Sequence, residues 1–344
     1  MSIELPAFGI AGWSRSGKTT LIVELVRHFA ARKLKIAVIK HDVHGLNTDR
    51  EGKDSDRFFR AGADVLLCGP GESLGRVHLV DSASLQAAVS RLDTEYDLIL
   101  IEGNKSANLA RKVWLLRDVT ETCPPDVPGI ARVLAPKEDR FGIVSAMVEE
   151  WLQKRIQTTP LYAGILFGGR SQRMGQPKHL LSIDGKTWLE HIVATVQPSV
   201  QQVVLLGTGK VPPSLCALPV LPDAPHKHGW LAGILAAMRW NPHVSWLFAA
   251  CDLPQISSVA VGWLTRQRGP GVWAILPRLP GAQGVEPLFA FYEFRARPFL
   301  ESTLAPSGLV GLPAVTTPEP PAQIANAWAN MNTLMDVARR QGPS

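Results

Sequence analysis

Cysteine and clustered charge are both scarce in this chain. Its 344 residues include 4 cysteines, and no two of them have the C-x2-C spacing of zinc ribbons and redox-active dithiols. We therefore expect reduced thiols, as in a cytoplasmic protein. The 36 Lys and Arg residues against 30 Asp and Glu residues give a formal charge of +6, which favours anionic ligands. No basic run alternates with aromatic residues, so we expect no nucleic-acid partner.

Long hydrophobic runs are also missing. No apolar run reaches the roughly 18 residues that a transmembrane helix needs, so we expect no membrane association. The first residues, MSIELPAFGIAG, have neither a basic start nor a long apolar core, so they do not resemble a signal peptide. Hydrophobic residues make up 46% of the chain, which is enough for buried cores. At roughly 150 residues per domain, the length suggests about two domains.

A glycine loop near the N-terminus lies between an apolar strand, predicted over 6–11, and a helix predicted over 20–32. The loop, GWSRSGKT, fits the pattern G-x4-G-K-[ST], and strand, loop and helix together are typical of a P-loop. Lys18 would reach the β- and γ-phosphates of a nucleotide, and Thr19 would bind Mg²⁺. The residues expected to bind nucleotide here are Gly12, Trp13, Ser14, Arg15, Ser16, Gly17, Lys18, Thr19 and Thr20.

A second glycine loop follows a polar linker that ends at Pro160. The apolar run over 161–167 predicts a buried parallel strand, after which come Gly168, Gly169 and two basic residues. Glycines let backbone N–H groups close around a polyanion, and Arg173 and Lys178 place positive charge where phosphates would lie. We therefore divide the chain into an N-terminal domain, 1–156, and a C-terminal domain, 157–344.

Two carboxylates end predicted buried strands. Glu102 ends a strand over 96–103 that shares its domain with the P-loop, which is the Walker-B position for a Mg²⁺ ligand. Asp252 follows a strand over 244–250, and a carboxylate at the carboxyl end of a central strand faces the binding crevice. Mg²⁺ takes one or two carboxylates together with substrate phosphates. Asp252 is therefore the candidate metal ligand of the C-terminal domain.

Histidines occur in two short polar segments. His41 and His44 flank Asp42, so both a metal site and a polar loop at the sheet edge stay open. His226 and His228 have no third ligand nearby in the sequence, and a zinc site and a plain loop again stay open.

Five segments of the N-terminal half together resemble a known family. They are GWSRSGKTT (12–20), VIKHDVHG (38–45), GKDSDRF (52–58), AGAD (61–64) and DLILIEGNK (97–105). They are similar to the MobB family of molybdopterin-guanine dinucleotide biosynthesis adaptors. The resemblance implies GTP binding with at most weak GTP hydrolysis, assistance to a partner enzyme, and a homodimer through the N-terminal domain.

Five segments of the C-terminal half show a closer resemblance. They are GGRSQRMGQPKHLL (168–181), LPDAPHKHGWLAGILAAM (221–238), ACDLP (250–254), EPLFAFY (286–292) and WANMNTLMD (328–336). In order and spacing they resemble the molybdenum cofactor guanylyltransferases, the MobA family. The resemblance implies transfer of GMP from GTP to molybdopterin with Mg²⁺. It also implies molybdopterin-delivering proteins and apo-molybdoenzymes, or their chaperones, as partners.

The resemblance also implies residue roles in the C-terminal domain. The catalytic set would be Arg173, Lys178 and Asp252, with Asp252 binding Mg²⁺. The GTP-binding set would be Leu166, Phe167, Gly168, Gly169, Ser171, Arg173, Lys178, Asp223 and Asp252. Asn330 and Asn332 would face the pterin, although either could instead cap the helix that follows.

One residue departs from the guanylyltransferase pattern. Pro177 stands where that family usually carries aspartate, and Pro-Lys is more typical of related cytidylyltransferases. Phe167-Gly168-Gly169 and the LAGI segment (231–234) fit the guanylyltransferases better. CMP transfer, nucleotidyl transfer to another phosphate, and a non-catalytic GTP-dependent pterin carrier stay open as alternatives. The expected fold is α/β in two domains, an N-terminal P-loop NTPase-type sheet and a C-terminal Rossmann-like nucleotidyltransferase sheet.

Overall fold

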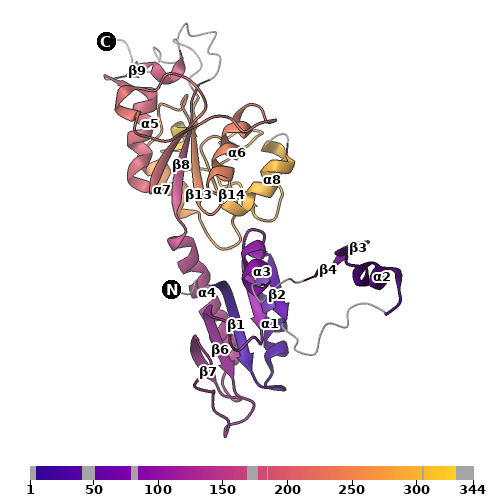
Figure 1. Cartoon of the computed structure of the whole chain (residues 1–344). Coiled ribbons are helices and arrows are strands. Elements are labelled where there is room, and N and C mark those ends of the chain that lie inside the picture. The colour runs from indigo at the N-terminus through magenta and orange to yellow at the C-terminus, as the bar shows by residue number, and fades with distance from the viewer. Residues whose placement is uncertain are drawn as a thin grey trace. The chain divides into compact units, whose positions relative to one another are not determined.

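The computed structural model describes residues 5–40, 51–78, 84–168, 177–183, 185–303 and 306–330 (Figure 1). The chain forms two compact units, Met1–Val148 and Glu149–Ser344, each with its own sheet. The prediction of an α/β chain with two domains is confirmed. Among the helices of the described ranges, none has the length and apolar character that crossing a bilayer would require.

The N-terminal unit contains a five-stranded parallel sheet. Its strands, in spatial order, are β2 (Ile36–Lys40), β5 (Leu98–Glu102), β1 (Leu5–Gly12), β6 (Leu109–Leu115) and β7 (Ile130–Leu134). Outside residues 51–78, the described part of this unit has the helices α1 (Lys18–Ala31), α3 (Ser84–Asp93) and α4 (Arg140–Thr158), the last of which continues into the second unit. The central strands β1 and β5 are buried along nearly their whole length, as expected for a parallel sheet covered on both faces.

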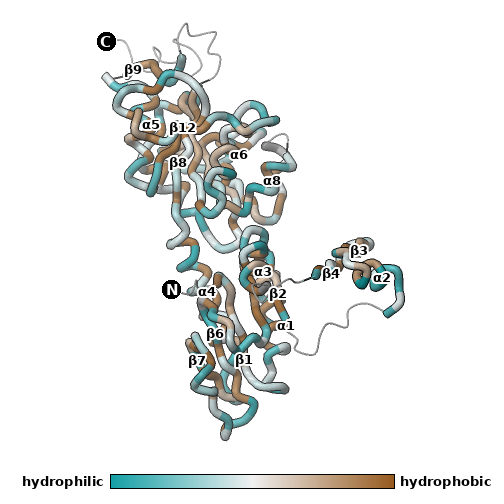
Figure 2. Tube along the Cα trace, in the orientation of Figure 1, coloured by the Kyte–Doolittle hydropathy of each residue, from teal (hydrophilic) through white to brown (hydrophobic). Residues whose placement is uncertain are grey.

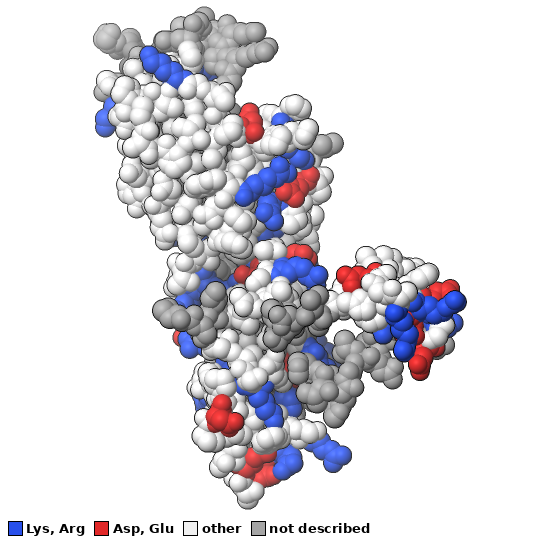
Figure 3. All heavy atoms as spheres, viewed as in Figure 1, with Lys and Arg blue, Asp and Glu red and all other residues white. Residues whose placement is uncertain are grey.

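Residues 51–78 form a helix, α2 (Asp54–Arg60), and an antiparallel hairpin of β3 (Val65–Gly69) and β4 (Glu72–Arg76). Asp56 is buried and accepts ion-paired hydrogen bonds from Arg60 (2.8 Å) and Arg76 (3.0 Å). A hydrogen bond from the backbone N–H of Gly52, together with the bonds from Arg60 and Arg76, holds the pKa of the Asp56 carboxyl well below its usual range. Figure 3 shows positive and negative side chains next to each other on this segment.

The C-terminal unit contains a seven-stranded sheet. Its strands, in spatial order, are β12 (Val220–Leu221), β11 (Gln202–Leu206), β8 (Leu161–Leu166), β13 (Ser245–Ala250), β15 (Ala290–Tyr292), β14 (Ala274–Ile275) and β16 (Val315–Thr316). The first four strands are parallel, whereas β15 runs antiparallel to both of its neighbours. Figure 2 shows hydrophobic residues along strands such as β8. The predicted strands over 161–167 and 244–250 are confirmed.

Alternate residues of β13 contribute to two cores on opposite faces of this sheet. Leu247 and Ala249 pack with α5 (Trp188–Val196) and α7 (Ser258–Arg266). Trp246 and Phe248 pack with α6 (Trp230–Trp240) and α8 (Arg297–Ser302). This alternation follows from the two-residue period of a strand, and helices pack on both faces of the sheet.

Gly164 on β8 is required by this packing. A Cβ at this position would lie 2.6 Å from the ring of Phe248 and 2.7 Å from Leu206. We expect Gly164→Ala to lower the free energy of unfolding of the C-terminal unit by about 1–3 kcal/mol, because buried side chains must shift. Urea unfolding of the full chain, followed by tryptophan fluorescence, measures this change. Gly284→Ala is the control, since no atom lies within 4 Å of its Cβ position; equal losses in the two variants would contradict the packing argument.

Candidate functional site

The carboxyl ends of three neighbouring strands meet at one edge of the C-terminal sheet. The last residues of β8, β11 and β13 are in register, with Leu166 opposite both Leu206 and Ala250. The chain passes from β8 to β11 on one side and later to β13 on the other side. In α/β sheets such a reversal of strand order leaves a crevice outside the carboxyl ends of the strands, where ligands bind.

Glycine allows the two connections at this edge to approach closely. Gly168 has a φ of 91°, and a Cβ there would lie 2.3 Å from the carbonyl oxygen of Thr208. Gly207 has a φ of 128°, and a Cβ there would lie 2.1 Å from the carbonyl oxygen of Phe167. Side chains at either position would force the connections apart, so the shape of the crevice depends on both glycines.

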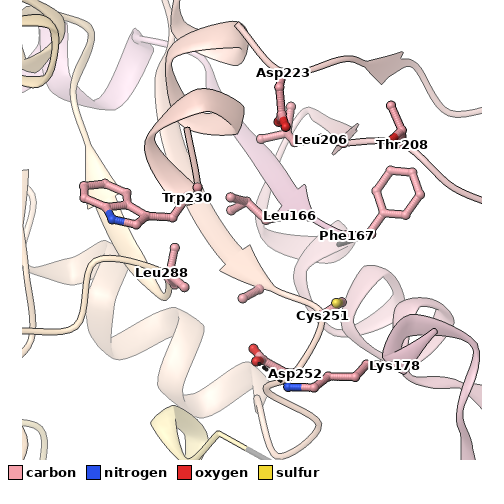
Figure 4. A pocket seen from close by; sticks show the side chains of 14 residues that line it. Leu166, Phe167, Lys178, Leu206, Thr208, Asp223, Trp230, Cys251, Asp252 and Leu288 are labelled. Atoms are coloured by element: carbon pink, nitrogen blue, oxygen red, sulfur yellow. Dashed lines mark hydrogen bonds and ion pairs between the residues drawn. The ribbon is translucent and has the colours of Figure 1, made fainter. Parts of the chain in front are cut away.

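Lys178 and Asp252 meet in this crevice. The Nζ atom of Lys178, in the 3₁₀ turn η1 (Lys178–Leu180), lies 3.3 Å from Oδ2 of Asp252, just after β13 (Figure 4). Their side chains are 20% and 22% exposed, so both can be reached from the crevice. The other carboxylate oxygen, Oδ1, is buried and has no hydrogen-bond partner among the described residues. Such an oxygen can accept a bond from a ligand or coordinate a cation.

A pocket of about 470 Å³ surrounds this ion pair, a size within the range of small-molecule sites. Figure 4 shows Asp223 and Thr208 on one side of it, with Trp230 and Leu288 on another. The full lining is Leu166, Phe167, Gly168, Lys178, Leu206, Gly207, Thr208, Asp223, Gly229, Trp230, Ala250, Cys251, Asp252 and Leu288. The pocket therefore combines apolar walls with a few charged and polar groups.

Eight lining residues were not among the predicted site residues: Leu206, Gly207, Thr208, Gly229, Trp230, Ala250, Cys251 and Leu288. Thr208 follows the carboxyl end of β11 just as Asp252 follows that of β13, so its position after a buried strand was a usable signal. Trp230 begins α6 and Leu288 precedes β15. Both lie within segments quoted for the family resemblance, 221–238 and 286–292, but no site role was assigned to either residue there.

Two further ionisable groups lie near Asp252. Burial raises the pKa of the Cys251 thiol to about 12, so it stays protonated and weakly nucleophilic. Burial, and then the charge of Asp252, raises the pKa of the Glu286 carboxyl. Excess negative charge is therefore disfavoured beside Asp252, and positive charge is favoured there.

His179 fixes the turn that carries Lys178. Its ring is buried, and Nε2 lies 3.0 Å from the carbonyl oxygen of Lys210. The ring also makes an edge contact with Phe167, with centroids 5.2 Å apart. Burial lowers the pKa of His179. A neutral ring with its proton on Nε2 would donate to Lys210, so His179 ties η1 to the connections after β8 and β11.

The N-terminal unit brings its predicted site together at the carboxyl ends of β1 and β5. Gly17, in the left-handed conformation, precedes the first residue of α1, Lys18. The Nζ atom of Lys18 donates to the carbonyl oxygen of Trp13 (2.7 Å). The Oγ1 atom of Thr19 donates to Oε1 of Glu102 (3.0 Å). The glycine loop and the acid of the neighbouring strand therefore lie next to each other.

Arg140 binds the backbone of the glycine loop and was not predicted by the sequence analysis. Its guanidinium donates to the carbonyl oxygens of Ser16 (2.8 Å), Ala135 (3.0 Å) and Leu134 (3.2 Å), and also to that of Leu116. An arginine at the start of a helix has no distinguishing sequence pattern, so only the fold reveals this contact.

Comparison with known families agrees with this geometry. The family model of molybdopterin guanine dinucleotide synthesis protein B matches residues 7–134, and that of the MobA-like NTP transferase domain matches residues 163–317.

Individual relatives extend these matches. The molybdopterin-guanine dinucleotide biosynthesis adapter protein of Escherichia coli (strain K12) is 33% identical over 169 residues, covering 44% of this chain and 95% of that protein. A probable molybdenum cofactor guanylyltransferase of Bacillus cereus (strain AH187) is 34% identical over 142 residues, covering 40% of this chain and 70% of that protein. The chain belongs to both families. Its N-terminal part is an adapter unit, and its C-terminal part is a nucleotidyltransferase of molybdopterin guanine dinucleotide biosynthesis.

A solved structure similar to the nucleotidyltransferase unit is molybdopterin-guanine dinucleotide biosynthesis protein A from Archaeoglobus fulgidus. It is 24% identical, with a TM-score of 0.43, and the match covers 52% of this chain and 95% of that one.

The predicted residues of the nucleotidyltransferase unit fall into three groups. Those that line one pocket are Leu166, Phe167, Gly168, Lys178, Asp223 and Asp252. Those that lie outside the described residues are Gly169, Ser171, Arg173 and Asn332. Asn330 is described and exposed.

Of the two histidine segments, the structure describes one and not the other. His41, Asp42 and His44 also lie outside the described residues, whereas His226 and His228 are described. Within the part of the chain that is described, no three His, Cys, Asp or Glu side chains are grouped to hold a metal ion.

We expect the nucleotidyltransferase unit to lose stability as the pH falls below about 6.5, the ordinary pKa of histidine. The pKa of His179 is lower in the folded than in the unfolded chain, so the unfolded chain binds more protons at acidic pH. The slope from this one residue is at most about 1.4 kcal/mol per pH unit. Urea unfolding between pH 7 and pH 5 should show a flatter dependence in His179→Gln, and an unchanged one in the exposed-residue control His191→Gln. Identical slopes in wild type and His179→Gln would show that His179 carries no such linkage.

Proposed function

We propose that the nucleotidyltransferase unit transfers GMP from GTP to molybdopterin, giving molybdopterin guanine dinucleotide and pyrophosphate. The observation that carries this proposal is the Lys178–Asp252 pair at the carboxyl edge of the sheet, inside a pocket of nucleotide size. The names of the similar proteins, molybdenum cofactor guanylyltransferases, support the choice of GTP and of the acceptor.

The residues around Asp252 fit a Mg²⁺ ion. Asp252 offers a buried carboxylate oxygen without a protein partner among the described residues, and Mg²⁺ binds through one or two carboxylates plus phosphate oxygens. Bound there, Mg²⁺ would supply positive charge that stabilises the charge developing on the phosphates. In the adapter unit, the hydroxyl of Thr19 and the carboxylate of Glu102 lie together and would offer oxygen ligands to a Mg²⁺ ion.

The chain's own groups would bind and orient the reactants. Lys178 would neutralise the triphosphate, with Arg173 as a second cation from the same loop. Leu166, Phe167 and Gly168 would hold the base, and Asp223 would hold the nucleoside. The asparagines at 330 and 332 would bind the pterin.

The reaction itself needs no general base. A phosphate monoester has a second pKa of about 6, so the molybdopterin phosphate is already an anion near neutral pH. One of its oxygens would form a bond to the α-phosphorus of GTP, and the bond from that phosphorus to the β-phosphate oxygen would break. Pyrophosphate leaves with the electron pair. The main barrier is repulsion between anions, which the positive charge of Lys178 reduces.

The adapter unit, 1–156, is proposed to bind GTP at Lys18 and Thr19 and to assist the nucleotidyltransferase unit, 157–344. Covalent linkage raises the local concentration of two weakly associating modules. Molybdopterin-delivering proteins and apo-molybdoenzymes, or their chaperones, are proposed partners, and a homodimer through the adapter unit is a further proposal.

A second candidate is CMP transfer, favoured by Pro177. This proline directly precedes η1 and sets the start of the turn that carries Lys178. Incubation with molybdopterin and each α-³²P-labelled nucleoside triphosphate separates the candidates. Label in a pterin dinucleotide from GTP supports the first, and label from CTP alone supports the second.

We expect Asp252→Asn to lower the transfer rate at least about 100-fold, because the charge that balances the cations of the site is removed. Pyrophosphate release measures the rate, and circular dichroism should show an intact fold. Glu301→Gln is the control, since Glu301 forms an exposed ion pair with Arg239 in the same unit. Near wild-type transfer by Asp252→Asn would remove Asp252 from the mechanism.

We expect Lys18→Ala to abolish nucleotide binding at the P-loop while the basal transfer rate at saturating GTP stays within about twofold of wild type. Calorimetric titration with GTP should then lose one of two binding events. Loss of basal transfer in this variant would mean that the second site depends on the first.

A further inference from the structure

Lys105 lies beside the P-loop although it comes from the neighbouring strand connection. β5 ends at Glu102, and Gly103 (φ 83°) and Asn104 (φ 45°) then turn the chain in the left-handed region. After glycine, asparagine is among the residues that adopt this conformation most readily, so the pair Gly-Asn suits the turn. The turn delivers Lys105 three residues after Glu102.

The ammonium group of Lys105 rests on the second residue of the glycine loop. Its Nζ atom lies 3.2 Å from the ring centroid of Trp13, a cation–π contact. Trp13 in turn makes an edge contact with the fully buried Trp114, with centroids 5.7 Å apart. Both partners of the cation–π contact thus belong to the rim of the nucleotide site, and one of them is anchored in the core.

A buried lysine fixes the backbone that carries Lys105. Lys112 on β6 is fully buried, and its Nζ atom donates to the carbonyl oxygens of Lys105 (2.8 Å), Ala107 (2.5 Å) and Pro128 (3.1 Å). An ammonium group has three N–H donors, so every one of them is used. Gly9 lies opposite Lys112 in the sheet, and a Cβ there would come within 3.1 Å of the lysine stem.

The positive charge of Lys105 lies close enough to that of Lys18 to affect its pKa. Burial lowers the pKa of Lys18, the charge of Glu102 raises it, and the charge of Lys105 lowers it further. Two cations held at one site repel each other, and an anion between them removes that cost. A triphosphate is the anion for which strand, glycine loop and Lys18 are arranged.

We propose that Lys105 is a further phosphate-binding residue of the P-loop site, directed at the terminal phosphate of a nucleoside triphosphate, and that Lys112 is its positioning residue. This inference rests on the proposed nucleotide binding of the adapter unit. The terminal phosphate is favoured because Lys105 follows Glu102, which accepts a hydrogen bond from Thr19, and Lys18, next to Thr19, would reach the β- and γ-phosphates.

Calorimetric titration of the full chain with GTP and with GDP, both with Mg²⁺, tests the proposal. Binding that disappears in Lys18→Ala is assigned to the P-loop. Lys105→Met should weaken this binding about 10-fold for GTP and less than about 2-fold for GDP, and Lys105→Arg should retain most of it. Lys137→Met, at an exposed lysine of the same unit, is the matched control and should change neither.

Lys112→Met should produce the same selective loss for GTP, and adding it to Lys105→Met should cause no further loss. A purely structural role for Lys112 would instead weaken GTP and GDP alike. Equal GTP affinity in wild type and Lys105→Met, or an equal loss for both nucleotides, would overturn the proposal while leaving GTP binding intact. Absence of any Lys18-dependent binding in the wild type would overturn the proposed nucleotide binding and this inference with it.

Discussion

The ion pair between Lys178 and Asp252 is the interaction on which the nucleotidyltransferase site depends. It joins a turn after β8 to the carboxyl end of β13, two segments far apart in sequence that the parallel sheet places side by side. The pair is partly exposed, so solvent screens it and its contribution to stability is small. The pair matters for the position of its charges. Lys178 places a positive charge where the phosphates of a nucleotide would bind, and Asp252 places a negative charge where their metal ion would bind.

Both units place a lysine and a carboxylate at the carboxyl ends of neighbouring strands. In each, a buried strand is followed in the sequence by glycines and then by a lysine, and a carboxylate ends or follows a neighbouring strand. Gly168 and Gly207 let two connections touch in one unit, and Gly17 starts the helix that carries Lys18 in the other. Buried residues then hold these segments in place: His179 secures the turn with Lys178, and Lys112 secures the one with Lys105.

The sequence predicted those parts of the fold and site that depend on local order. Lys18, Glu102 and Asp252 were found because each directly follows or ends a pattern of strand and loop. Trp230 starts α6 and neither ends nor follows a strand, so this order does not mark it, and the fold places it in the pocket. Lys112 has no distinguishing sequence pattern, because its role depends on the register of β6 with β1, which places it opposite Gly9.

A structure of the full chain with GTP and Mg²⁺ bound tests the central claim most directly. The account predicts electron density for a triphosphate in the pocket between Gly168 and Asp252, with phosphate oxygens in contact with Lys178 and the metal ion beside the Oδ1 atom of Asp252. An empty pocket, with Lys178 still 3.3 Å from Asp252 while GTP occupies the P-loop alone, would contradict it.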